Sequence, residues 1–193
     1  MDARGTQGPW LEAGREAKLL SAARRGDLPS YFELLRAHQR PLWRLCFALA
    51  RHRGEAELLL QETSRRAWRN LRALQPNQRF MPWLVRALRT VAVARQRRPG
   101  ETRAAVGAFR PNGEAWSGGA SGAHELGFEQ RALAAFAELS VDEQMLLALR
   151  LFERLPYPDI AAALDLPLAA TVHRIAALRE GLEQTLQRTE RAA

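Results

Sequence analysis

The chain has 193 residues, enough for one ordinary domain or two small ones, and its 47% hydrophobic and 26% charged residues are typical of a folded globular protein. Its longest apolar stretches are shorter than the roughly 18 residues of a membrane span, and the N-terminus has no secretory-signal pattern. The one cysteine, Cys46, excludes an intramolecular disulfide, and no Cys/His cluster has zinc spacing. We expect a cytoplasmic protein without membrane contact, metal or cofactor.

The net charge of +8 is distributed unevenly along the chain. Residues 15–98 hold 19 Arg or Lys against 6 Asp or Glu, a net charge of +13, whereas residues 128–193 hold 7 against 10, a net charge of −3. Clustered arginine releases counterions from phosphates, so the basic half favours a nucleic-acid partner over a merely solvated basic face. The acidic C-terminal half argues against assigning DNA binding there on charge alone.

Residues 1–14 are expected to form a flexible tail, because they hold three glycines and a proline. A helical domain follows over residues 15–98, with a break at Gly26. Its second helix is predicted by apolar side chains at near-helical spacing, namely Phe32, Leu35, Leu42, Leu45, Cys46 and Leu49. Pro41 should kink or split that helix, and Gly54 should end the segment. The next helix is expected from about Glu55 to Leu74.

Between residues 99 and 127 the chain becomes rich in glycine, which predicts a flexible linker and therefore two domains. The C-terminal domain, residues 128–193, contains a capping box from Ser140 to Glu143 that should open a helix. Pro158 suits the first turn of the next, short helix. No alternating strand pattern of useful length occurs, so we predict an all-α fold of two small helical domains.

Residues 159–175 combine a short helix, a tight turn and a longer helix, which is the geometry of a helix-turn-helix. A DNA-binding interpretation places His173, Arg174 and Arg179 of the second helix toward a major groove. An ordinary pair of antiparallel helices is at least as good an interpretation of this segment alone.

The basic half offers a second candidate surface. Its helix from Glu55 mixes leucines with Gln and Arg, which suits docking against a partner helix. The following helix combines arginines with Trp83, and arginine and aromatic side chains together suit single-stranded nucleic acid. Taken alone, Phe80 and Trp83 are better explained as core residues.

Two segments resemble the conserved domains of bacterial sigma factors of the extracytoplasmic-function type, in the sigma-70 family. The first is GDLPSYFELLRAHQRPLWRLCFALARHRGEAELLLQETSRRAWRNLRAL followed by RFMPWLVRALRTVAVARQRR, with its ETxxRAWR helix, its Phe-x-x-Trp-Leu helix start and its closing Arg pair. The second is AFAELSVDEQMLLALRLFERLPYPDIAAALDLPLAATVHRIAALREGL, which resembles the entry into the family's helix-turn-helix. Val172 stands where the family often has lysine, and Thr90 where it often has asparagine.

The resemblance implies a promoter-recognition subunit that is not itself an enzyme and that works with core RNA polymerase (its clamp and flap), promoter DNA and an anti-sigma factor. The residues it implies for core-polymerase binding in region 2 are Leu58, Gln61, Glu62, Arg65, Trp68 and Arg69. Those implied for binding and opening the −10 element are Gln75, Asn77, Arg79, Phe80, Trp83, Arg86, Arg89, Thr90, Arg97 and Arg98. Those implied for the −35 element in region 4 are Ala170, Thr171, His173, Arg174 and Arg179.

A sigma-like interaction protein is the alternative: it would bind polymerase or an anti-sigma factor without reading the −35 element. The basic half favours a working sigma factor, whereas the weakly charged second helix of the helix-turn-helix favours the alternative. An enzyme is disfavoured, because the four histidines are scattered and the chain has no Gly-rich phosphate loop.

Overall fold

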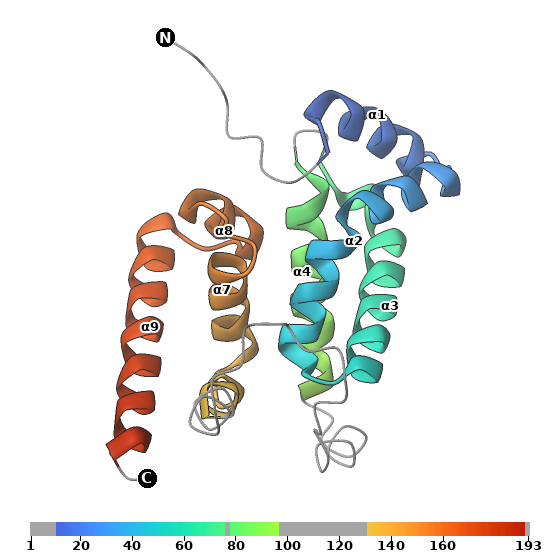
Figure 1. The fold of residues 1–193 in the computed structure, drawn as a ribbon. Helices are drawn as coiled ribbons and strands as arrows, with labels where there is room; N and C mark the ends of the chain where they lie inside the picture. Colours follow the sequence, from blue (N-terminus) through green and yellow to red (C-terminus); the bar gives the residue numbers. More distant parts are fainter. Residues whose placement is uncertain (1–10, 76–77, 97–130, 192–193) are drawn as a thin grey trace.

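The computed structural model describes residues 11–75, 78–96 and 131–191, with side chains to residue 188. Every regular element in these ranges is helical, which confirms the predicted all-α fold. The first half comprises α1 (Ala13–Arg24), α2 (Leu28–Ala50), α3 (Arg53–Arg69), the short 3-10 helix η1 (Leu71–Ala73) and α4 (Phe80–Gln96) (Figure 1). The second half comprises a helical stretch at 131–137 and then α7 (Val141–Leu151), α8 (Tyr157–Leu164) and α9 (Leu168–Arg191). The expected linker at 99–127 lies outside the described residues.

Several helix boundaries differ from the sequence-based expectations. Helix α1 begins at Ala13, so the last residues of the expected tail are helical. Helix α2 runs without a break through Pro41, which is buried; the helix loses one backbone hydrogen bond there, and packing of its apolar face outweighs that loss. Gly54 does not end a segment but lies in the first turn of α3. The chain turns earlier instead, at Arg51, whose φ of 56° is left-handed.

Local signals explain where other helices begin. Asp27 caps α2, because its carboxylate accepts a hydrogen bond from the Ser30 amide at 3.0 Å. Gly26 precedes it with a φ of 101°, a conformation that glycine adopts without strain. The predicted capping box of α7 is present: the Ser140 hydroxyl accepts from the Glu143 amide, and the Glu143 carboxylate accepts from the Ser140 amide. These caps satisfy amide groups that a helix start leaves without partners.

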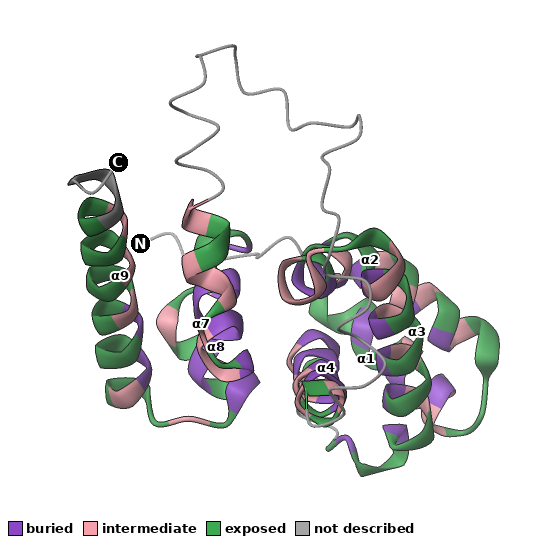
Figure 2. Cartoon of the chain, turned by 90° about the horizontal axis from the view of Figure 1, so that it is seen from below, coloured by how far each residue is buried: buried purple, intermediate pink, exposed green. Residues whose placement is uncertain are grey.

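The first half has one hydrophobic core, formed where α2, α3 and α4 pack on one another and α1 packs on α2. Figure 2 shows the buried residues on the facing sides of these helices and the exposed residues on their outer sides. The largest fully buried side chains include Leu34, Leu45, Phe80, Leu84 and Leu88. This core fixes which faces of α3 and α4 are left for a partner.

The helix-turn-helix is formed by α8 and α9, which meet at an angle of 104° across a turn at residues 165–167. Asp165 makes the turn with a left-handed φ of 56°. The small core beneath it consists of Ile160, Leu164 and Ile175 packed against α7. The predicted motif is therefore present in geometry.

The two halves pack together into a joint core. Helix α4 contacts α8 and α7, and α2 contacts α7, so the second half covers one side of the first (Figure 1). Buried residues of both halves belong to one continuous cluster. In the described part of the chain the two halves are therefore packed against each other, an arrangement called closed below. The surface of α4 that faces α7 and α8 is partly covered.

Candidate nucleic-acid and polymerase interface

Helix α3 presents one polar face beside one buried face. Ala56, Leu59, Thr63 and Ala67 recur at helical spacing and are buried, which turns the opposite side outward. The exposed side carries most of the residues predicted to bind polymerase, namely Leu58, Gln61, Glu62, Arg65 and Arg69. Leu58 is an apolar side chain that is 45% exposed. The sixth predicted residue, Trp68, is only partly exposed, because its ring packs on Tyr31 at 4.8 Å between centroids.

A shallow hollow lies between α3 and α4. It is lined by Glu62, Arg65, Arg66, Arg69 and Val91. Among the described residues, no acidic side chain forms an ion pair with any of these three arginines. Glu62 is engaged elsewhere, since Arg95 pairs with it at 3.3 Å. The hollow therefore has a positive rim suited to an acidic surface or a phosphate.

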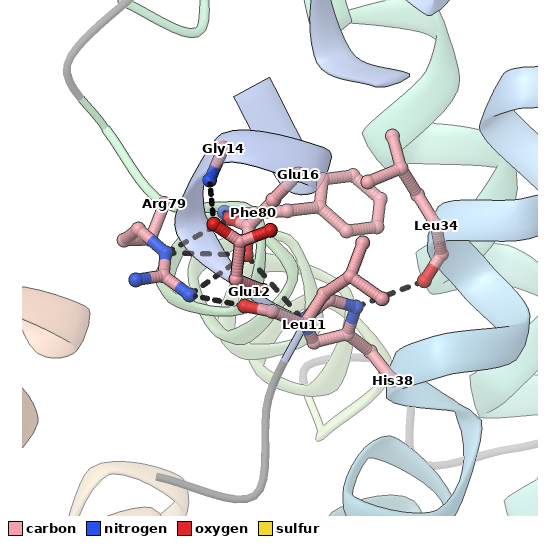
Figure 3. A network of polar contacts seen from close by, with 8 residues as sticks. All are labelled: Leu11, Glu12, Gly14, Glu16, Leu34, His38, Arg79 and Phe80. Atoms are coloured by element: carbon pink, nitrogen blue, oxygen red, sulfur yellow. Dashed lines mark hydrogen bonds and ion pairs between the residues drawn. The ribbon is translucent and has the colours of Figure 1, made fainter. Parts of the chain in front are cut away.

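The loop before α4 is held at both ends. Leu74 is buried at its start, and at its end the Arg79 guanidinium donates to the Glu16 carboxylate of α1 at 2.9 and 3.1 Å (Figure 3). Gln75 is exposed, and its backbone amide donates to the side-chain oxygen of Gln78 at 3.2 Å. Asn77, predicted to contact the −10 element, lies outside the described residues, as do Arg97 and Arg98.

The predicted DNA-contacting residues of α4 divide between core and surface. Phe80 is fully buried and packs edge-on against Tyr31 and His38, so it is a core residue rather than a surface contact. Trp83 is half-buried, and its indole N–H donates to the Ala67 carbonyl at 3.3 Å. The Arg86 guanidinium lies 5.8 Å from the centre of the Trp83 ring. Thr90 is exposed, although its hydroxyl donates to the Arg86 carbonyl.

Two of the α4 arginines contact the second half of the chain. Arg89 donates two hydrogen bonds of 2.6 Å to the Asp142 carboxylate at the start of α7. This pairing is the main reason why the pKa of Asp142 is lowered and that of Arg89 is raised. Arg86 donates to the Ala162 carbonyl of α8 at 3.3 Å. A third contact joins Arg44 of α2 to Glu153 at 2.7 and 2.8 Å. The face predicted to meet DNA is thus partly occupied by α7 and α8.

The predicted −35 residues lie along α9 but do not form one surface. Thr171 is fully buried, and its hydroxyl donates to the Pro167 carbonyl at 3.1 Å, so it holds the turn rather than contacting a base. Ala170 is half-buried. His173, Arg174 and Arg179 are exposed, and Arg179 has a distant pair with Glu183 at 4.0 Å. The exposed set therefore carries two fixed positive charges.

Other chemistry receives little support. No three His, Cys, Asp or Glu side chains within the described ranges are arranged to hold a metal ion. Cys46 is buried, which raises the pKa of its thiol to about 12 and keeps it protonated. Within the same ranges, no single helix is long and apolar enough to cross a membrane. Helices α8 and α9, which are bent relative to each other, reach that length and apolar composition only when they are taken together.

Sequence reasoning missed the residues that hold the candidate surface in place. Glu16 falls at the start of the helical domain expected at 15–98, and Asp142 falls within the predicted capping box, but neither was expected to contact another helix. Arg44 and Glu153 were not singled out at all. A pattern within one helix cannot show such contacts, because each joins residues at least 53 positions apart.

Comparisons with known proteins agree with this architecture. The family description of sigma-70 region 2 matches residues 34–101. RNA polymerase sigma-H factor from Pseudomonas aeruginosa is 28% identical over 191 residues, covering 92% of this chain and 96% of that protein. The structure of CnrH in complex with the cytosolic domain of CnrY superposes with a TM-score of 0.66 at 20% identity, covering 90% of this chain and 98% of CnrH. The sigma factor RpoE from Bartonella quintana, in complex with the anti-sigma factor NepR, superposes with a TM-score of 0.63 at 21% identity, covering 83% of this chain and 98% of RpoE.

The match to region 2 falls on the helices that carry the polar face of α3 and the arginines of α4. The similarity to sigma-H extends over nearly the whole chain, including the helix-turn-helix. Residues 34–101 thus match sigma-70 region 2, most of the chain is similar in sequence to an RNA polymerase sigma factor, and the solved sigma-factor structures share its all-helical fold.

Proposed function

We propose that the exposed face of α3 binds core RNA polymerase and that the loop at 75–79 and α4 bind and open the −10 element. The observation that carries this proposal is the hollow between α3 and α4, whose three arginines have no acidic partner among the described residues. Unpaired guanidinium groups gathered along one helix, α3, are suited to acidic protein surfaces and to phosphates. The exposed Leu58 beside them would supply an apolar anchor.

In this proposal α4 contacts the separated DNA strand. Trp83 offers a partly exposed aromatic ring, and Arg86 and Arg89 offer charge, a combination that suits stacking on unpaired bases and holding of phosphates. Both arginines are engaged by α7 and α8 in the closed chain. Because one guanidinium cannot hold Asp142 and a phosphate in the same position, α7 must leave α4 before Arg89 contacts DNA.

The second half would meet the −35 element and the polymerase flap once it has been released. Its contribution to DNA affinity should be small, since His173, Arg174 and Arg179 are the exposed candidates on α9. Two of the structural relatives were solved in complex with another protein, the cytosolic domain of CnrY in one case and the anti-sigma factor NepR in the other. We extend this to the present chain and propose an anti-sigma partner and a cytoplasmic site of action, where core polymerase is found.

The alternative of an interaction protein without −35 readout rests on one observation. The side chain at Val172 is apolar, and Thr171 is buried, so two neighbouring positions of the second helix of the motif offer no charge to DNA. Such a protein would bind core polymerase through α3 and start no transcript.

Run-off transcription tests the proposal directly. Core polymerase from the source organism, with and without the purified chain, is supplied with a pool of genomic promoter fragments. Discrete new transcripts are expected; stable binding to core without any transcript would favour the interaction protein.

Core binding by α3 is tested separately by measuring affinity for core polymerase. The joint substitution Gln61→Ala and Arg65→Ala should weaken it by about tenfold or more. The matched control is Arg53→Ala with Glu57→Ala, which removes an exposed pair from the start of the same helix that is not among the predicted docking residues. Equal affinity of the two double variants would show that the docking face is wrongly placed.

A further inference from the structure

The carboxylate of Glu16 is a buried charge that joins α1 to the start of α4. Glu16 is 1% exposed, although glutamate is almost never fully buried unless it is paired. It accepts a hydrogen bond from the Phe80 amide at 2.6 Å and two contacts of 3.1 and 2.9 Å from Arg79 (Figure 3). These donors come from residues 63 and 64 positions further along the chain.

This contact caps α4 from another helix. The first amide groups of a helix lack intrahelical acceptors, and a carboxylate at that end is favoured by the helix dipole. The Phe80 amide is such a group, and Glu16 satisfies it in the way that a local Ser or Asp usually does. Helix α1 lies outside residues 34–101, which match sigma-70 region 2.

Arg79 is fixed by the same carboxylate. Besides its contacts with Glu16, it donates to the Leu11 carbonyl at 2.9 Å. Its guanidinium therefore points toward α1, where it anchors the end of the loop. A direct phosphate contact by Arg79 would require giving up this arrangement.

His38 lies beside the Glu16 carboxylate, but it does not supply the positive charge that pairs with it. Its Nδ1 donates to the Leu34 carbonyl at 2.9 Å, which leaves Nε2 as the unprotonated nitrogen, 4.0 Å from the Glu16 carboxylate. Burial is the main reason why the pKa of His38 is lowered, so the ring is neutral at pH 7. The charge partner of Glu16 is therefore Arg79.

The two ends of the loop are thus fixed by different means. Leu74 enters the core at one end, and Glu16 holds Arg79 and the start of α4 at the other. Between them, Gln75 is exposed. Fixed ends limit the positions that the exposed side chains of such a short loop can adopt.

We propose that Glu16 is a positioning residue for promoter specificity: it fixes Arg79 and the start of α4 and thereby positions Gln75 and Gln78, the other described residues of the loop before α4, to read bases of the −10 element. The inference rests on the proposed function of that loop. Glu16 itself does not touch DNA; it acts through Arg79 and through the cap of α4.

The test is run-off transcription on a promoter library in which the −10 element is randomised, with sequencing of the transcripts. The variants are Glu16→Gln, which keeps the size of the side chain but not its charge, and Arg79→Ala, which removes the partner. Glu33→Gln is the control, since it removes an exposed carboxylate that pairs with Arg15 of α1. All are compared at saturating binding to core polymerase and below their melting temperatures.

We expect both variants to lose about fivefold or more of the base preference at the same position of the element, while the control keeps it. The double variant should lose no more than either single one, because both changes break one contact. A uniform fall in transcript yield with unchanged base preference would overturn the inference and leave a purely structural role for Glu16. If Glu16→Gln does not fold, Arg79→Ala decides, because Arg79 is partly exposed and its loss leaves the cap of α4 intact. If the unmodified chain starts no transcript at all, the proposed function fails first, and this inference fails with it.

Discussion

Helices α4 and α9 are both predicted to meet DNA, but they are held by the fold in different ways. Helix α4 contacts α2, α3, α7 and α8, and 8 of its 17 residues are buried. Over the described side chains of α9, only Thr171 and Ile175 are buried. A substitution in α4 therefore tests folding and DNA contact together, whereas most substitutions in α9 test DNA contact alone.

The charges on the two helices differ in the same way. Arg86 and Arg89 of α4 already bond to the second half of the chain, and Arg95 pairs with Glu55 and Glu62. On α9, Arg174 and Arg179 are exposed. The net charge of the first half thus overstates how many of its arginines are free to bind phosphate, and access to α4 depends on moving α7 and α8.

The largest expected effect contrasts a buried residue at the start of α4 with an exposed residue of α9. Phe80→Ala should lower the free energy of unfolding by about 3–5 kcal/mol, because it empties a fully buried aromatic site. His173→Ala on exposed α9 should change it by no more than about 0.5 kcal/mol. Urea unfolding monitored by circular dichroism measures both. A stable Phe80→Ala protein would mean that α4 is not held by its core face.

The buried His38, which packs against the start of α4, should make the stability of the first half depend on pH. The described residues of α9 include no buried histidine. Burial lowers the pKa of His38 from 6.5 in the folded state, so the unfolded chain binds the proton more readily between the two values. The free energy of unfolding should therefore fall as pH drops below about 6.5, with a slope of at most about 1.4 kcal/mol per pH unit. His38→Asn, which retains a donor for the Leu34 carbonyl, should remove that dependence above pH 5. An equally steep dependence in the variant would assign it to other groups.

Much of the fold could be predicted from local patterns, because helical spacing and caps act within a few residues. Ser140 and Glu143 mark the start of α7, and the exposed face of α3 follows from the spacing of its buried residues. Of the kink or split expected at Pro41, the split was wrong, because packing of α2 outweighs one missing hydrogen bond. The pattern alone favoured a core position for Phe80, but it could not show that Thr171 is buried, since that depends on which residues lie opposite it.

Breaking the contact between the halves should expose α4. In Asp142→Asn, Arg89 loses its carboxylate partner, and since both side chains are about 40% exposed the pair contributes at most about 1 kcal/mol. The free protein should then bind a single-stranded oligonucleotide up to about fivefold more tightly. Fluorescence anisotropy at fixed low salt measures this.

The matched control for that change is Asp159→Asn. It also removes one acidic charge from the first turn of a helix, but from an exposed site in α8. A similar gain in both variants would indicate a general charge effect rather than release of Arg89. No gain in either would mean that α7 does not restrict access to α4.

The smallest expected effect is on promoter affinity, and it tests whether α9 contacts DNA at all. Val172 is 38% exposed on α9, so Val172→Lys can add a positive charge with little change in stability. If α9 lies against the −35 element, promoter affinity of the polymerase complex should rise a few-fold, and the slope of its logarithm against the logarithm of salt concentration should steepen by about 1. Gln184→Lys, an exposed position three turns further along α9, adds the same charge away from the turn and should change neither quantity. If both variants behaved like the unmodified chain, α9 would have no part in DNA binding, and the contrast between the two helices would be one between a DNA-contacting helix and a purely structural one.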